Sequence, residues 1–275
     1  MAVATRRRGL VRIPRWGLVV LVLAVVTAGT VWLVLSTRRP PAPGCTVASA
    51  DNADHWALTP DQAQNAATIA GVGLRSGMPD HAVTVALATA FQESKLRNLT
   101  GGDLDSAGLF QQRPSQGWGT YAQVTDPIHA SESFFRRLRA QPNWAQLTVT
   151  EAAQLVQRSA APGAYAQWEA EARALAGALT GETPAALTCH NLVLAPSAGD
   201  LAATASAELG TSAVSGAHER GQGWSLASWL VANAVRFGID RIAFDGQTWT
   251  AATGAWTGGG PADGTLNLHR LPVGA

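Results

Sequence analysis

One acidic side chain, Glu93, stands out as able to do acid–base chemistry. It lies near the end of a long apolar run that begins at Asp80. On a helix, Ala90, Thr89 and Ala86 share its face, because they precede it by three, four and seven residues. A carboxyl group that emerges among small residues at the edge of a buried helix loses hydration, which raises its pKa. Such a group suits a general acid that works near neutral pH, although the Thr89 hydroxyl could hydrogen-bond it.

A long irregular segment follows this acid. Residues 98–123 read NLTGGDLDSAGLFQQRPSQGWGTYAQ, which is rich in Gly, Asp and Ser and contains aromatic residues. The segment is too broken for a helix, and long loops of this kind often carry binding residues. We expect an irregular insertion, with room for a β-hairpin, that forms a binding surface.

Helices must hold the acid and the loop in place, and their start signals are clear. Thr59-Pro60-Asp61-Gln62 combines an N-cap, a proline at the first helical position and a capping-box glutamine. Asp126-Pro127 and Thr148-Val149-Thr150-Glu151 mark two further helix starts. The predicted helices are residues 60–75, 80–98, a third from 127, a fourth from 149 and a last one at 163–179.

The N-terminal part predicts a membrane anchor. Residues 1–15 hold five arginines, and residues 16–35 follow without a charge. Such a run matches the ~20 residues that a helix needs to cross a bilayer, and the arginine excess before it places the N-terminus in the cytoplasm. A cleaved signal peptide is the alternative, but cleavable apolar runs are shorter and end in small residues. Residues 36–44 are a Pro-rich linker, so everything beyond them is expected outside the cell membrane.

The two cysteines, Cys45 and Cys189, then lie in a compartment where disulfides persist. We expect them to pair and to tie the start of the first domain to its end, with two separate buried thiols as the alternative. The six histidines show no metal-ligand spacing, so neither a metal nor a cofactor is expected. A net charge of +1 excludes a global field for nucleic acid.

The residues around Glu93 resemble those of the lysozyme-like superfamily. Three parts carry the resemblance: Glu93-Ser94 at the end of a helix, the run Ser106-Ala107-Gly108-Leu109-Phe110-Gln111 with Pro114 three residues later, and Tyr165 late in the domain. The similarity spans residues 58–179 and is to soluble lytic transglycosylases, goose-type lysozymes and their actinobacterial relatives. It implies a mostly helical lysozyme-like domain.

The resemblance also implies a reaction, the cleavage of peptidoglycan glycan strands between N-acetylmuramic acid and N-acetylglucosamine. Glu93 would protonate the bridging oxygen. In transglycosylases of this kind the C6 hydroxyl of muramic acid then closes on C1, which gives a 1,6-anhydro end without a second carboxylate. In hydrolytic members water attacks, and an inverting arrangement needs a base about 6.5–9.5 Å from the acid. Asp103 and Asp105 are the candidates for that base, unless they only cap turns in the loop.

Five further positions carry over as substrate contacts. The resemblance places Ser94 and Gln111 where they line the cleft or orient the acid, and Ser106 belongs to the same motif. Trp118 is positioned to offer a ring face to a sugar, with simple packing as the alternative. Tyr165 resembles a tyrosine that hydrogen-bonds the catalytic glutamate, although its neighbours depart from the family's Ala-Tyr-Asn-Ala-Gly pattern.

A second domain is expected at residues 196–275, after the first at residues 45–190. Its signals predict a small α+β unit: a helix at residues 225–235, strands at 239–244, 247–250 and 266–271, and a tight turn at Asp245-Gly246. The unit resembles a C-terminal module of secreted actinobacterial wall proteins, and we assign it no chemistry. The fold class of the whole chain is therefore α+β.

Two functions from different classes fit these observations. The first is an enzyme that cleaves peptidoglycan, as transglycosylase or muramidase. The second is a non-catalytic peptidoglycan-binding or scaffold protein that docks on glycan and contacts a cell-wall or division partner through residues 196–275. Glu93 discriminates between them, because a binding protein tolerates Glu93→Gln whereas the enzyme does not.

Overall fold

The structure is a computed structural model that describes residues 41–273 without a gap. Before them it describes only residues 16, 20, 23, 24, 26–30 and 32. No helix among the described residues is long and apolar enough to span a membrane. The predicted tail at 1–15, most of the predicted anchor at 16–35 and the first part of the linker at 36–44 lie outside the described residues. The membrane anchor therefore stays a prediction.

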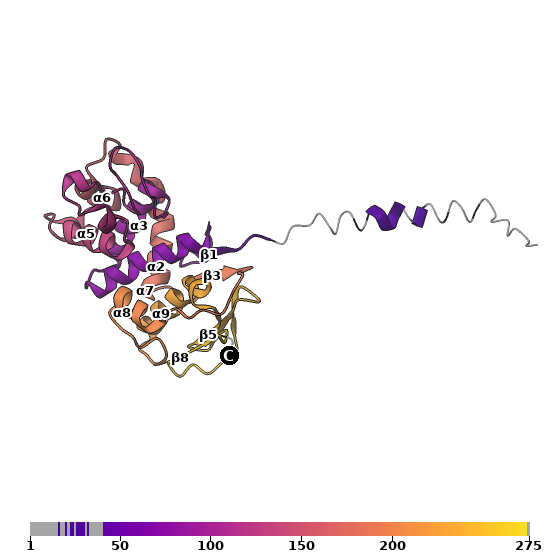
Figure 1. Cartoon of the computed structure of the whole chain (residues 1–275). Helices are drawn as coiled ribbons and strands as arrows, with labels where there is room; N and C mark the ends of the chain where they lie inside the picture. Colours follow the sequence, from indigo (N-terminus) through magenta and orange to yellow (C-terminus); the bar gives the residue numbers. More distant parts are fainter. Residues whose placement is uncertain are drawn as a thin grey trace, which may run out of the picture. The chain divides into compact units, whose positions relative to one another are not determined.

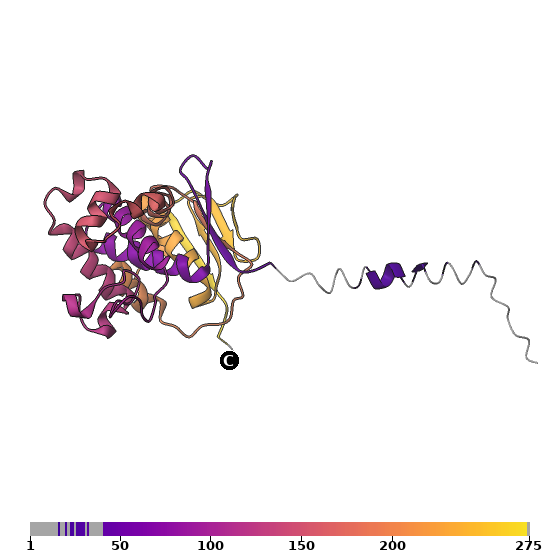
Figure 2. The same cartoon turned by 90° about the horizontal axis from the view of Figure 1, so that it is seen from above.

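The chain divides into two compact units, Met1–Ala42 and Pro43–Ala275, and the second has the predicted mixture of helices and strands (Figures 1 and 2). Short 3-10 turns lie at Pro114–Gln116, Trp144–Gln146 and Pro162–Trp168. The helices are α2 (Pro60–Arg75), α3 (Asp80–Ser94), α4 (Tyr121–Val124), α5 (Pro127–Arg139), α6 (Val149–Gln157), α7 (Glu169–Thr180), α8 (Leu201–Leu209), α9 (Arg220–Ala232) and α10 (Ala234–Phe237).

Helix α3 forms the centre of the helical part. Every residue from Ala82 to Phe91 is buried, and α2, α5, α6 and α7 pack around it. This agrees with its sequence, which is apolar nearly all round and is typical of a helix without a solvent face. The acid at position 93 is therefore carried at the end of a largely buried helix.

The three helix starts predicted from capping signals are confirmed. Thr59 and Gln62 form the capping box of α2, and Thr148 and Glu151 form that of α6. The Asp126 carboxylate accepts a hydrogen bond from the first turn of α5. These local signals fix helix boundaries because a cap satisfies backbone N–H groups that have no partner within the helix.

The last helix of the first part, expected at 163–179, instead begins as a 3-10 turn and is α-helical only from Glu169. The helix expected at 225–235 starts earlier, at Arg220, and ends at Ala232.

The end of α3 differs from the prediction, which extended the helix to residue 98. Lys95 and Leu96 both adopt left-handed backbone angles, with φ of 56°, and the helix stops at Ser94. Leu96 is fully buried, and side chains of α2 hold the turn: Gln62 Nε2 donates to the Lys95 carbonyl over 2.9 Å, and Asn65 Nδ2 donates to the Leu96 carbonyl over 2.8 Å. Burial of Leu96 and capping from α2 outweigh helical propensity here.

Two antiparallel sheets complete the unit. In the smaller sheet the order is β2-β1-β3, and its strands bring Cys45 opposite Cys189. These cysteines form the predicted disulfide. The strands of this sheet had no clear sequence signal. The larger sheet has the order β4-β8-β5-β6-β7 and contains the three predicted C-terminal strands. The strands are β1 (Gly44–Ala48), β2 (His55–Leu58), β3 (Leu187–His190), β4 (Gly216–Ala217), β5 (Ile239–Phe244), β6 (Gln247–Thr250), β7 (Ala255–Gly258) and β8 (Thr265–Arg270).

The two parts expected as separate domains, residues 45–190 and 196–275, pack together within Pro43–Ala275. Helices α2 and α7 lie between α3, α5 and α6 on one side and the C-terminal elements on the other (Figure 1). The buried Ser225 hydroxyl donates to the Leu179 carbonyl over 2.7 Å across this junction. One continuous core thus joins both parts, and their independent folding stays a prediction.

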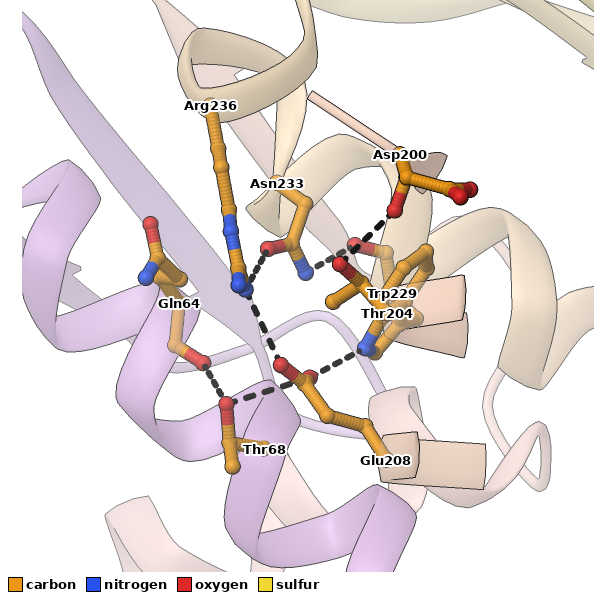
Figure 3. Close-up of polar contacts among 8 residues, drawn as sticks. All are labelled: Gln64, Thr68, Asp200, Thr204, Glu208, Trp229, Asn233 and Arg236. Atoms are coloured by element: carbon orange, nitrogen blue, oxygen red, sulfur yellow. Dashed lines mark hydrogen bonds and ion pairs between the residues drawn. The ribbon is translucent and has the colours of Figure 1, made fainter. Parts of the chain in front are cut away.

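A buried carboxylate, Glu208 of α8, strengthens this junction (Figure 3). Its side chain is only 3% exposed and forms a salt bridge with Arg236 at 2.9 Å. Trp229 Nε1 donates to it over 2.8 Å, and the Thr68 hydroxyl of α2 donates over 3.1 Å. A buried charge is tolerated only when it is paired and hydrogen-bonded in this way. The C-terminal helices are therefore fastened to α2 by a polar contact as well as by packing.

Candidate active site

A cavity of about 770 Å³ opens beside the end of α3. The loop after α3, the second half of α5 and the end of α6 contribute its walls. Most of its lining is polar, as suits a sugar-binding cleft better than a site for an apolar ligand. The lining includes Glu93, Asp103, Ser106, Gln111, Arg113, Trp118, Arg137, Gln157 and Arg158.

Glu93 sits half-buried in the last turn of α3 and faces this cavity. Burial raises the pKa of its carboxyl, while hydrogen bonds from Tyr165 and Gln157 and the charge of Lys95 partly offset that rise. The expected direction of the pKa shift is confirmed. A carboxyl of this kind holds its proton to a higher pH than an exposed glutamate does.

The small residues on the Glu93 face are confirmed as buried. Ala86, Thr89 and Ala90 have no exposed surface. The Thr89 hydroxyl, however, donates to the Val85 carbonyl of its own helix over 2.7 Å. Since that bond uses its donor within the helix, Thr89 does not compensate for the lost hydration of the carboxyl.

Tyr165 reaches the acid from a distant part of the chain. Its buried hydroxyl donates to Oε1 of Glu93 over 3.0 Å. Burial raises the pKa of Tyr165 first, and the neighbouring Glu93 raises it further, so the hydroxyl stays protonated as a donor. The contact implied by the family resemblance is therefore present, despite the unusual residues around Tyr165. The hydrogen bond holds Oε1 of the Glu93 carboxyl in a fixed orientation.

Ser94 hydrogen-bonds the loop after α3 and is not among the residues that line the cavity. Its hydroxyl, which is buried, donates to the Leu109 carbonyl over 2.7 Å. Behind this contact the Phe110 ring stacks on Phe134 at 4.7 Å between centroids. The Ser-Ala-Gly-Leu-Phe-Gln motif is thus bound to α3 at the residue next to the acid. Ser94 positions the loop that forms one wall of the site.

The backbone at Gly108 shows why this position of the motif requires glycine. Its φ is +78°, and a Cβ built there would lie 2.0 Å from the Val124 carbonyl oxygen. A side chain is excluded both by the backbone angle and by the contact with a backbone atom. The expected hairpin is reduced to a single antiparallel bridge between Ala107 and Gln112.

Ser106, Gln111 and Trp118 all line the cavity, as expected. The Ser106 hydroxyl donates to Oε1 of Gln111 over 3.0 Å, so these two side chains hold each other. Trp118 is only 7% exposed, and the Arg137 guanidinium lies 3.6 Å from its ring centroid. One ring face is therefore already covered by a cation, which favours packing as the main role of Trp118.

The two aspartates proposed as bases have different surroundings. Asp105 forms a salt bridge with Arg113 at 2.8 Å and accepts a hydrogen bond from the Ser115 backbone N–H over 2.7 Å. These contacts hold the pKa of Asp105 well below its usual range, which makes it a weak base. Asp103 is exposed and lines the cavity. Of the two, only Asp103 lines the cavity, and its role as a base stays a prediction.

Sequence reasoning missed three side chains of the site. Gln157 hydrogen-bonds the Glu93 carboxyl and donates through Nε2 to the Phe110 carbonyl over 2.9 Å. Arg137 and Arg158 line the same cavity. The capping box of α6 located the helix that ends at Gln157, but no local signal shows which distant residues a helix end will meet. Of the described residues, no group of three or more His, Cys, Asp or Glu side chains is placed to bind a metal.

Comparison of the chain with models of known protein families, and separately with curated proteins, found no match. The functional assignment therefore depends on the residues and geometry described above.

Proposed function

We propose that this protein cleaves peptidoglycan glycan strands between N-acetylmuramic acid and N-acetylglucosamine, with Glu93 as the general acid. One observation supports this most directly: a half-buried carboxyl with a raised pKa faces a polar cavity and is held by a tyrosine hydroxyl. Burial favours the protonated form of Glu93, which can give its proton to the bridging oxygen. The sequence resemblance to lytic transglycosylases and goose-type lysozymes supports the same reaction.

The proposed proton transfer uses the two oxygens of Glu93 differently. Oε1 accepts the hydrogen bond of Tyr165, and Oε2 carries the proton toward the glycosidic oxygen. When the bond from that oxygen to C1 of muramic acid breaks, the proton leaves Glu93 as the carboxylate forms. Tyr165 and Gln157 both hydrogen-bond the carboxyl, and these bonds strengthen on the charged form.

The group that attacks C1 defines two versions of the reaction. In a transglycosylase, the C6 hydroxyl of the same sugar attacks and its proton returns to Glu93. In a hydrolase, Asp103 takes the proton of an attacking water. Asp105 is a poor candidate because Arg113 and Ser115 occupy its carboxylate.

Asp103→Asn separates these versions. If the sugar hydroxyl attacks, the variant releases fragments at a rate within about threefold of the wild type, and mass spectrometry finds ends one water lighter than reducing ends. If Asp103 is the base, release falls about 10²-fold or more and the wild-type products carry reducing ends.

We further propose that the protein acts at the outer face of the cell membrane. The predicted anchor at 16–35 and the Pro-rich linker at 36–44 would hold the folded unit close to its polymeric substrate, and residues 196–275 would offer a surface to a cell-wall or division partner. The disulfide between Cys45 and Cys189 agrees with an oxidising compartment.

Purified full-length chain incubated with peptidoglycan sacculi tests the proposal. Soluble muropeptide fragments should accumulate with time. A chain that binds sacculi and releases nothing would instead be the non-catalytic glycan-binding protein, and the enzymatic proposal would fail.

A further inference from the structure

Besides Arg113, two further arginines line the cavity, although a neutral glycan does not require such positive charge. Arg137 comes from α5, and Arg158 follows directly after the last residue of α6. Arg158 adopts a left-handed backbone with φ of 52° and ends the helix. It therefore stands beside Gln157, which hydrogen-bonds the acid.

Among the described residues, no carboxylate forms a salt bridge with either guanidinium. Within residues 41–273, Arg113 is paired with Asp105, whereas Arg137 and Arg158 form no ion pair. Arg137 instead donates to the Gly117 carbonyl over 2.9 Å and covers the Trp118 ring. Burial lowers the pKa of Arg137, and the charges of Arg136 and Arg158 lower it further. Two like charges thus face one cleft at a cost in free energy.

Unmatched guanidinium groups in a cleft favour an anionic ligand. Arginine presents N–H donors in a planar fork that matches both oxygens of a carboxylate, and a cleft with one sign of charge concentrates ligands of the opposite sign. The hydroxyl and acetamido groups of the glycan are neutral and do not need such charge. The peptide stem on muramic acid carries the carboxylates of the polymer.

We propose that Arg137 and Arg158 bind a carboxylate of this peptide stem, so that the cleft selects glycan strands whose stems are present with free carboxylates. This inference rests on the proposed function, since it names the part of peptidoglycan that the same cleft binds in addition to the glycan. Arg158 is exposed and supplies the charge at the mouth of the cleft. Arg137 is held by Trp118 and Gly117 and offers a fixed donor.

Calorimetric titration of the full-length Glu93→Gln chain tests this binding without cleavage. The first ligand is a tetrasaccharide of alternating N-acetylglucosamine and N-acetylmuramic acid with tetrapeptide stems. The second ligand differs only in having its peptide carboxylates converted to amides. We expect the acidic ligand to bind about tenfold more tightly, as a charge-assisted contact predicts.

Variants then assign the preference to its residues. Arg158→Gln should reduce it to about twofold or less, and Arg158→Lys should restore part of it because the charge returns without the fork. Arg241→Gln, which removes an exposed arginine of β5 outside the cavity lining, should leave the preference unchanged.

Equal affinity for the two ligands would overturn the carboxylate site, and so would a preference that survives both Arg158→Gln and Arg137→Gln. Release from sacculi by the wild-type chain is measured in parallel. Equal affinities together with normal release overturn only this inference, whereas absence of release overturns the proposed reaction whatever the affinities.

Discussion

Glu93 is subject to two opposing influences on its pKa. Burial raises it, and the hydrogen bonds of Tyr165 and Gln157 together with the charge of Lys95 lower it. A general acid needs this compromise, because a pKa that is too low leaves no proton to give and one that is too high makes proton transfer slow. The activity should therefore fall as the pH rises through the raised pKa of Glu93.

Tyr165→Phe tests the role of the hydroxyl. Its hydrogen bond favours the charged carboxylate, so its removal raises the pKa of Glu93 further and moves the alkaline limb of the pH–rate profile to higher pH. Maximal release should also fall, by about tenfold, because the carboxyl loses its orientation. The profile of release from sacculi against pH measures both effects.

Tyr121→Phe is the matched control, because its hydroxyl donates to the Thr100 carbonyl at an exposed position. That variant should keep the wild-type alkaline limb. An alkaline limb that moves to lower pH in Tyr165→Phe would contradict the assigned hydrogen bond.

At the scale of elements, the loop after α3 is shaped by close backbone contacts. Ser94 binds its Leu109 carbonyl, and Gly108 fits against the Val124 carbonyl oxygen with no room for a Cβ. The loop holds Ser106 and Gln111 at the cavity. A displacement of the loop backbone would therefore move these two side chains.

Gly108→Ala should therefore damage both stability and activity. We expect at least about 1 kcal/mol of lost stability, because alanine is strained at positive φ, and about a tenfold slower release because the cavity wall shifts. Chemical denaturation and the release assay measure the two effects. Gly101→Ala is the control in the same loop, since nothing lies within 4 Å of a Cβ built there, and it should behave as wild type.

The helices were the most predictable elements, and the reason is local. Thr59, Asp126 and Thr148 cap their helices with side chains only three residues from their partners, so a short stretch of sequence contains the whole interaction. The early end of α3 was not predictable in this way. It depends on the burial of Leu96 and on hydrogen bonds from α2, which no local pattern records.

The residues of the site also divide into those that local sequence predicts and those that depend on tertiary packing. Glu93, its buried face and the loop beside it follow from local sequence and from the family resemblance. Gln157 and Arg158 reach the cavity only because α6 packs on α3, and the strands of the small sheet pair residues 144 positions apart. Contacts of that range come from tertiary packing, which sequence periodicity does not encode.

At the scale of the whole molecule, the contacts of Glu208 with Thr68 and Arg236 link α2 to the C-terminal helices (Figure 3). Glu208→Gln should lower the free energy of unfolding by about 1–2 kcal/mol, because it removes the buried partner of an ion pair whose arginine is partly exposed and can still be hydrated. Urea denaturation at neutral pH measures this loss.

Glu169→Gln is the control for that experiment, since it breaks the Arg173 pair on the surface of α7 and should cost less than about 0.5 kcal/mol. Equal stabilities of the two variants would show that the junction does not depend on Glu208.

The account as a whole depends on the carboxyl of Glu93, and one comparison tests it most directly. Full-length wild type and Glu93→Gln are incubated with the same sacculi, and both bound protein and released muropeptides are quantified. Glutamine keeps the size of the side chain and a hydrogen-bond acceptor for Tyr165, but it has no proton to donate to the glycosidic oxygen. We predict unchanged binding to sacculi and a loss of release of about 10²-fold to 10⁴-fold. Release that continues at the wild-type rate in Glu93→Gln would contradict the assignment of Glu93 as the acid.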